Sequence, residues 1–212
     1  MNAQTERLSL AGPAGAIEAL RDAPPAGVAA RGVAVIAHPH PLFGGTMDNK
    51  VVQTLARACV ACGWTALRFN FRGVGGTAGS HDDGRGELDD MLVVVQQAAP
   101  EGPIALAGFS FGAYCQTRVA KRLTEAGHPA QRLVLVGTAA GFVEGTRQYD
   151  TEAVPHDTIV IHGSKDETVP LDNVFDWALP LDLPVVVVPG ADHFFHRRLH
   201  VIRDIISRAW RH

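Results

Sequence analysis

One serine in this chain has a glycine two residues before it and another two residues after it. The stretch is GFSFG, Gly108 to Gly112, and no serine other than Ser110 has this surrounding. The apolar run PIALA precedes it and the helix-like stretch AYCQTRVAKRL follows it. A strand that turns sharply into a closely packed helix needs glycines there and exposes the serine Oγ near the helix N-terminus, where an oxyanion is stabilised. The pattern predicts a nucleophilic serine; the alternative is a tight turn with an inert serine.

The elements that must position Ser110 alternate between strands and helices. Strands are predicted at 32–37, 65–71, 103–109, 132–137, 158–163 and 184–190, and helices at 47–63, 86–100, 111–127, 172–179 and 196–210. Several strands are unbroken apolar runs, as in parallel sheets covered by helices on both faces. We therefore expect one α/β domain over 1–212, with a doubly wound, mostly parallel sheet and an N-terminal antiparallel hairpin at 5–10 and 16–22. In such sheets the chemistry lies at the carboxyl ends of the strands.

A nucleophilic serine needs a base to accept its proton and a carboxylate to orient that base. Asp166 follows the strand at 158–163, and His193 follows the strand at 184–190. Both lie at the sheet edge where Ser110 is expected, and their order in the chain fits a nucleophile, acid and base series. We predict Asp166 as the acid and His193 as the base. Less well placed alternatives are Asp157, His162, Asp192 and His196.

The motifs GFSFG, HGSKDETVP and GADHFF, in this order, resemble the α/β-hydrolase superfamily. The stretches AHPHPLFGGTMDNKVV and LRFNFRGVGGTAGSHDDGRGELDD resemble a narrower group of small, lidless bacterial hydrolases, described as dienelactone-hydrolase-like or as esterases. The resemblance runs from about Arg31 onward. It implies the α/β-hydrolase fold and a serine hydrolase that cleaves an ester or thioester through an acyl-enzyme. The dienelactone hydrolases themselves use a cysteine nucleophile, so Ser110 argues against that particular activity.

Two backbone N–H groups should bind the oxyanion. The first belongs to Phe111, the residue after the nucleophile. The second lies in the loop HPHPLFGG after the strand at 32–37, where the two prolines have no N–H to offer. His38, His40 and Leu42 remain as nearby donors. The resemblance places the donor at His40, and Leu42 is the next alternative.

The connection between the strands at 132–137 and 158–163 is where many hydrolases insert a cap. It has no helical stripe long enough for a lid, so we expect no cap domain and an open site. With nothing to close over a long chain, short acyl groups should be preferred. The candidate substrate-binding side chains are Phe43, Phe109 and Phe194.

Three other motifs have alternative chemical interpretations. HPH, with His81, Asp82 or Asp83, could bind a metal, but the ligand spacing of known hydrolase metal sites is missing. GVGGTA resembles the glycine-rich fingerprint of dinucleotide-binding sites. That fingerprint leads directly into a helix, whereas a long loop follows here. The pair Cys59 and Cys62 falls at the end of a predicted helix, which favours small buried side chains over redox chemistry. We expect neither a metal nor a cofactor.

The composition limits the partners. The formal net charge is −3 and no run of Lys or Arg stands out, so nucleic acid is not expected. No apolar run approaches the roughly 20 residues of a membrane span, and the first fifteen residues do not resemble a secretion signal. We expect a cytoplasmic monomer or homodimer that acts on a small-molecule ester or thioester. Alternatives are acyl transfer or amide hydrolysis at the same triad, or a non-catalytic binding protein of the same fold.

Overall fold

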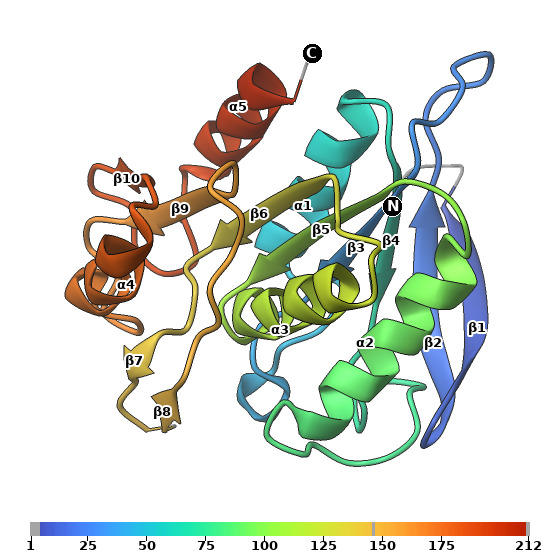
Figure 1. Ribbon diagram of the computed structural model, residues 1–212, viewed down its shortest axis with the longest axis horizontal. Helices are drawn as coiled ribbons and strands as arrows, with labels where there is room; N and C mark the ends of the chain where they lie inside the picture. The colour runs from blue at the N-terminus through green and yellow to red at the C-terminus, as the bar shows by residue number, and fades with distance from the viewer. Residues whose placement is uncertain (1–4, 146, 211–212) are drawn as a thin grey trace.

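The computed structural model describes residues 5–145 and 147–210. Within them, eight strands form one sheet in the order β1-β2-β4-β3-β5-β6-β9-β10 (Figure 1). The strands are β1 (Glu6–Gly12), β2 (Gly15–Asp22), β3 (Val33–Ala37), β4 (Thr65–Phe69), β5 (Ile104–Phe109), β6 (Arg132–Val136), β9 (Ile159–Gly163) and β10 (Val185–Val188). The hairpin β1–β2 is antiparallel and joins β4 antiparallel, whereas all other neighbours are parallel. The predicted mostly parallel sheet with an N-terminal hairpin is confirmed.

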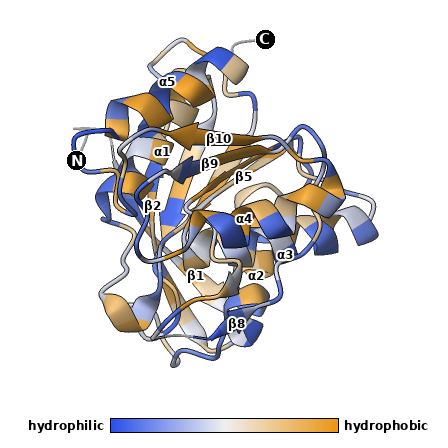
Figure 2. Cartoon of the chain, turned by 90° about the vertical axis from the view of Figure 1, so that its left-hand side faces the viewer, coloured by the Kyte–Doolittle hydropathy of each residue, from blue (hydrophilic) through white to orange (hydrophobic). Residues whose placement is uncertain are grey.

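Helices cover both faces of the sheet and enclose two apolar cores. The helices are α1 (Lys50–Ala61), α2 (Arg85–Ala98), α3 (Phe111–Glu125), α4 (Leu171–Ala178) and α5 (Leu199–Ala209). Apolar side chains of α1 and α5 share one core, and those of α2, α3 and α4 share the other. Figure 2 shows hydrophobic colour along the central strands and mixed colour on the helices that cover them. Unbroken apolar strands and amphipathic helices therefore account for the layers.

The last helix begins later than predicted, at Leu199 instead of residue 196. Phe195 and Arg197 have φ values of 53° and 62°, and left-handed residues cannot belong to a right-handed helix. The apolar side chains of Ile202 and Ile206 in this helix are buried, as is Trp210 at its C-terminal end.

The parallel strands bring several loops to one edge of the sheet. The segments after β3, β5, β9 and β10 all start at strand carboxyl ends, and the nucleophile, acid and base candidates lie in the last three of them. No helix in the described ranges is long and apolar enough to cross a membrane.

Candidate active site

Ser110 occupies a strained turn between β5 and α3. Its φ of 56° and ψ of −118° are unfavourable for any residue with a side chain, and such strain is typical of functional positions. A Cβ on Gly108 would lie 2.6 Å from the Cα of Ala113, and a Cβ on Gly112 would lie 2.4 Å from the carbonyl oxygen of His38. Both glycines are therefore required because backbone passes directly over them.

Ser110, His193 and Asp166 meet at the sheet edge. The Nε2 atom of His193 lies 3.1 Å from the Oγ of Ser110, and its Nδ1 lies 2.8 Å from Oδ2 of Asp166. Because the carboxylate only accepts, Nδ1 carries the proton of the neutral ring, and Nε2 is left to accept from the serine hydroxyl. The structure thus brings together the three residues that the sequence singled out, in the arrangement of a nucleophile, a base and an orienting acid.

The Asp166 carboxylate is fully buried and fully hydrogen-bonded. Its Oδ1 accepts from the backbone N–H groups of Thr168 and Val169, and its Oδ2 accepts from His193. The buried His162 lies beneath it, with Nε2 3.0 Å from the Val169 carbonyl oxygen and 3.4 Å from Oδ2 of Asp166. Burial, the largest cause, lowers the pKa of His162. These donors offset the cost of burying a carboxylate and fix its orientation.

Three of the four alternative acids and bases, Asp157, Asp192 and His196, have other partners. Asp192 accepts from the backbone N–H of His196 and lies 2.7 Å from its Nδ1, so these two exposed side chains pair with each other. Asp157 is exposed near Arg132, before β9 and thus at the opposite edge of the sheet. Neighbouring residues pointing in different directions explain why Asp192 does not replace Asp166 as the partner of His193.

Phe111 and His40, the two predicted oxyanion donors, both line the cavity that opens at Ser110. Phe111 is the first residue of α3, so its N–H has no partner within the helix. Within residues 5–145 and 147–210, the N–H of His40 makes no hydrogen bond to protein either. The N–H of Leu42 instead donates to Nδ1 of the His40 ring, at 3.3 Å. The geometry therefore favours His40 over Leu42 as the second free donor.

A cavity of about 190 Å³ opens at Ser110. Phe43 and Phe194, two of the predicted substrate-binding residues, line it with exposed side chains. Phe109 does not reach it, and the predicted contact of this residue with substrate is wrong. The Phe109 side chain is fully buried, and its ring packs 4.9 Å from the His193 ring and 6.0 Å from that of Phe194. Every residue of β5 is buried, so the Phe109 side chain packs in the core and contacts the His193 ring there.

A short hairpin forms one wall of this cavity and was missed by the sequence analysis. Its strands are β7 (Gly141–Phe142) and β8 (Gln148–Tyr149). They lie in the connection between β6 and β9, where the sequence predicted no cap domain and no strand. Val143 and Tyr149 line the cavity, and Arg147 stacks on the Tyr149 ring at 4.9 Å. The signal available in the sequence was a pair of short aromatic segments around Glu144 and Gly145.

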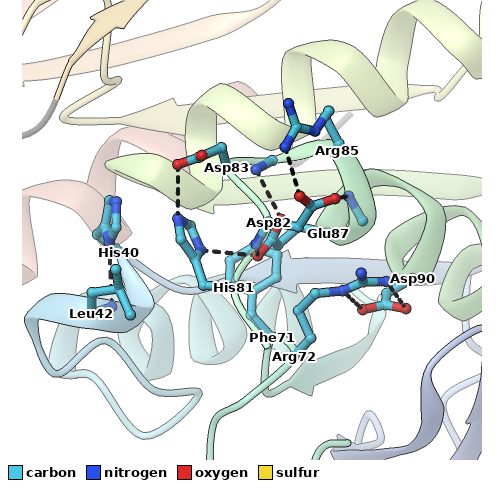
Figure 3. Close-up of polar contacts among 12 residues, drawn as sticks. His40, Leu42, Phe71, Arg72, His81, Asp82, Asp83, Arg85, Glu87 and Asp90 are labelled. Carbon is cyan, nitrogen blue, oxygen red and sulfur yellow. Dashed lines mark hydrogen bonds and ion pairs between the residues drawn. The ribbon is translucent and has the colours of Figure 1, made fainter. Parts of the chain in front are cut away.

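The residues of the alternative metal site serve other partners (Figure 3). Glu87 accepts from the backbone N–H groups of Asp82 and Gly84 and lies 2.9 Å from Nδ1 of His81. The His81 ring packs 4.8 Å from that of His40. The described residues include no group of three or more His, Cys, Asp or Glu that could hold a metal ion. Burial, followed by the charges of His81 and Arg147, lowers the pKa of His40 to about 4, so its ring is neutral at pH 7.

The remaining motifs have structural roles. In the stretch GVGGTA, the N–H of Gly76 donates to the carboxylate of Glu18, and the hydroxyl of Thr77 donates to the Asn70 carbonyl. The glycine-rich loop thus binds a carboxylate of the β1–β2 hairpin. Cys59 and Cys62 are buried at the end of α1, and burial raises the pKa of the Cys59 thiol.

Residues 88–182 match the family described as "Thioesterase domain". The structure is similar to that of XC6422 from Xanthomonas campestris, an α/β serine hydrolase without a lid (37% identity, TM-score 0.84, 100% of this chain and 95% of that one). It is also similar to an α/β serine hydrolase homologue from Coxiella burnetii (39% identity, TM-score 0.82, 96% of each chain). The uncharacterized protein RP471 of Rickettsia prowazekii is 33% identical over 189 residues, which cover 82% of this chain and 76% of RP471.

Proposed function

Because this chain belongs to the lidless serine hydrolases of the α/β-hydrolase superfamily, we propose that it cleaves a carboxylic ester or thioester through a Ser110–His193–Asp166 triad and an acyl-enzyme intermediate. The observation that carries the proposal is the pair of contacts at His193, 3.1 Å to the Oγ of Ser110 and 2.8 Å to Asp166, on a strained turn. An inert serine would not require that strain or two crowded glycines.

The proposed reaction has two halves. In the first, His193 Nε2 takes the proton of Ser110 as Oγ attacks the carbonyl carbon, and the protonated ring then gives that proton to the departing alcohol or thiol. In the second, His193 takes a proton from water, whose oxygen attacks the acyl carbon, and the proton returns to Ser110 as the acid leaves. Asp166 holds the ring and stabilises its charged form in both halves.

The backbone N–H groups of Phe111 and His40 would bind the oxyanion in both tetrahedral intermediates. The N-terminus of α3 adds a positive potential at the same position. Donors that are already in place do not have to reorganise during the reaction, which is why removal of one oxyanion donor costs about 100- to 1,000-fold in turnover.

The acyl group would lie in the apolar part of the cavity, between Phe43, Val143 and Tyr149. A buried cavity of about 150 Å³ accepts a benzene molecule, so about 190 Å³ suits a short or compact acyl group. The match of residues 88–182 to the Thioesterase domain family supports thioesters as substrates, since that segment contains both Ser110 and Asp166.

A matched panel of substrates tests this proposal. The same butyryl group is presented as a p-nitrophenyl ester, as a thioester and as an amide, and kcat/KM is measured for the wild type and for Ser110→Ala. We expect turnover of the ester and the thioester, with loss of both in Ser110→Ala. Equal turnover of the amide, or full activity in Ser110→Ala, would contradict the proposal.

A further inference from the structure

The proposed oxyanion donor at His40 is fixed by a second, buried histidine. We propose that His38 is a positioning residue of the oxyanion hole, because its Nδ1–H holds and polarises the Pro39–His40 peptide whose N–H would bind the oxyanion. This inference rests on the proposed function. His38 follows β3 and its side chain is completely buried, so it cannot touch substrate itself.

The hydrogen bonds of His38 determine which of its ring nitrogens carries the proton. The backbone N–H of Phe71 donates to Nε2, at 2.9 Å. Since a backbone N–H only donates, Nε2 is the unprotonated nitrogen, and Nδ1 carries the hydrogen. Nδ1 lies 2.6 Å from the carbonyl oxygen of Pro39 and therefore donates to it. Burial lowers the pKa of His38 to about 4, so this neutral tautomer persists at pH 7.

The bond to Pro39 fixes the direction of the neighbouring N–H. The carbonyl of Pro39 and the N–H of His40 are opposite ends of one planar peptide, and no cis peptide occurs in the described ranges. The two groups therefore point in opposite directions. Since the carbonyl points inward to the buried His38 ring, the N–H is turned toward the cavity that Pro39, His40 and Ser110 line.

The loop also packs closely against the Pro39 carbonyl. A Cβ on Gly45 would lie 2.0 Å from the Pro39 oxygen, so this glycine lets the loop close over the carbonyl. The carbonyl of His40 accepts from the N–H groups of Phe43 and Gly45, which fixes the following peptide as well. Rotation of the Pro39–His40 peptide would break the bond to His38 and disturb this turn.

His38 also connects the two proposed donors. Its side chain holds the peptide of His40, and its own carbonyl oxygen packs where a Cβ of Gly112 would be, one residue beyond Phe111. The loop that carries one proposed donor and the helix that carries the other thus both pack against His38. A hydrogen bond to a carbonyl also polarises the amide and makes its N–H a stronger donor, so the bond from Nδ1 adds to the preorganisation.

Two variants separate this role from plain support of the loop. In His38→Asn, the side-chain amide NH₂ stands near the position of Nδ1 and can still donate to Pro39. In His38→Gln, the amide oxygen can reach the position of Nε2 and accept from Phe71, while the donor to Pro39 is lost. For each variant, kcat and KM are measured on an activated ester, the inhibition constant is measured for a boronic acid that forms a tetrahedral adduct on serine, and the melting temperature is recorded.

We expect His38→Asn to keep kcat within about threefold of the wild type. We expect His38→Gln to lose about 10- to 100-fold in kcat and in boronic acid affinity, with KM within about twofold, since a misdirected donor weakens anion binding and not substrate binding. Equal effects of the two variants, effects that follow the melting temperature, or an inactive but folded His38→Asn would overturn the inference. An inactive wild type would overturn the proposed function itself, which separates the two failures.

Discussion

The Nε2 atom of His193 lies 3.1 Å from the Oγ of Ser110, although 83 positions separate the two residues in the chain. Ser110 is held in a left-handed conformation at the end of β5, and His193 lies in the loop after β10. The sheet brings them together because parallel strands place their carboxyl ends at one edge. Each consequence of this contact can be tested by changing the groups that create it.

Asp166 and Asp192 are a matched pair for testing the acid. We expect Asp166→Asn to lower kcat by about 10,000-fold, because an amide favours the wrong tautomer of His193. Asp192→Asn should retain activity within about threefold, since Asp192 pairs with His196 on the surface. Steady-state kinetics on an activated ester measure both. Similar losses in the two variants would show that Asp166 has no special role.

Gly112 tests whether the crowded turn is needed. Gly112→Ala places a Cβ 2.4 Å from the carbonyl oxygen of His38, so α3 or the oxyanion loop (residues 38–45, after β3) must move. Overpacking of this kind costs about 1–3 kcal/mol of stability, and we expect at least a tenfold loss of kcat. Gly102→Ala is the control because its nearest neighbour is 3.9 Å away. A fully active Gly112→Ala would contradict the described geometry.

Much of this arrangement could be predicted from the sequence, for identifiable reasons. Unbroken apolar runs indicated a parallel sheet, and the positions after those runs brought Ser110, Asp166 and His193 to one edge. The strands β7 and β8 are two residues each, too short to show a periodicity.

Other features depend on contacts that the sequence does not encode locally. A strand-end residue can face the cavity or the core, and Phe109 faces the core. The position of His38 beneath the oxyanion loop depends on its bond to Phe71, a partner 33 residues away. Local patterns therefore identified the residues that do chemistry better than those that hold them.

Acid pH should destabilise the protein through His38. Its pKa in the folded state is about 4, lowered by burial, and its ordinary value is 6.5. Between these values the unfolded state binds a proton that the folded state does not. The contribution of the neutral, buried His38 to the free energy of unfolding is therefore fully present above pH 6.5 and is lost as pH falls toward 4. This difference in pKa corresponds to a loss of about 3 kcal/mol in the free energy of unfolding once the pH has fallen to about 4.

Urea unfolding between pH 7 and 4.5 measures this dependence. We expect His38→Gln, which has no titratable group at this position, to lose less stability on acidification than the wild type does. His128→Gln is a control on an exposed histidine and should follow the wild type. Parallel curves for His38→Gln and the wild type would show that His38 does not contribute.

The cavity should limit the acyl group. We expect kcat/KM to be highest for acyl chains of about two to six carbons, since longer chains leave apolar surface in water. Val143→Phe reduces the cavity and should shift the preference to shorter chains, whereas Val186→Phe, on the partly exposed edge strand β10, should not. A rise in kcat/KM toward long chains, unchanged by Val143→Phe, would place the acyl group elsewhere.

Covalent labelling of Ser110 tests the central claim most directly. A fluorophosphonate reacts quickly only with an activated hydroxyl, and loss of fluoride leaves a phosphonylated serine whose position is mapped by mass spectrometry. We expect a single adduct on Ser110, formed at least 100-fold more slowly in a folded His193→Ala variant. An adduct on Ser80 or Ser164 instead, no adduct on the folded wild type, or unchanged labelling without His193 would contradict the account.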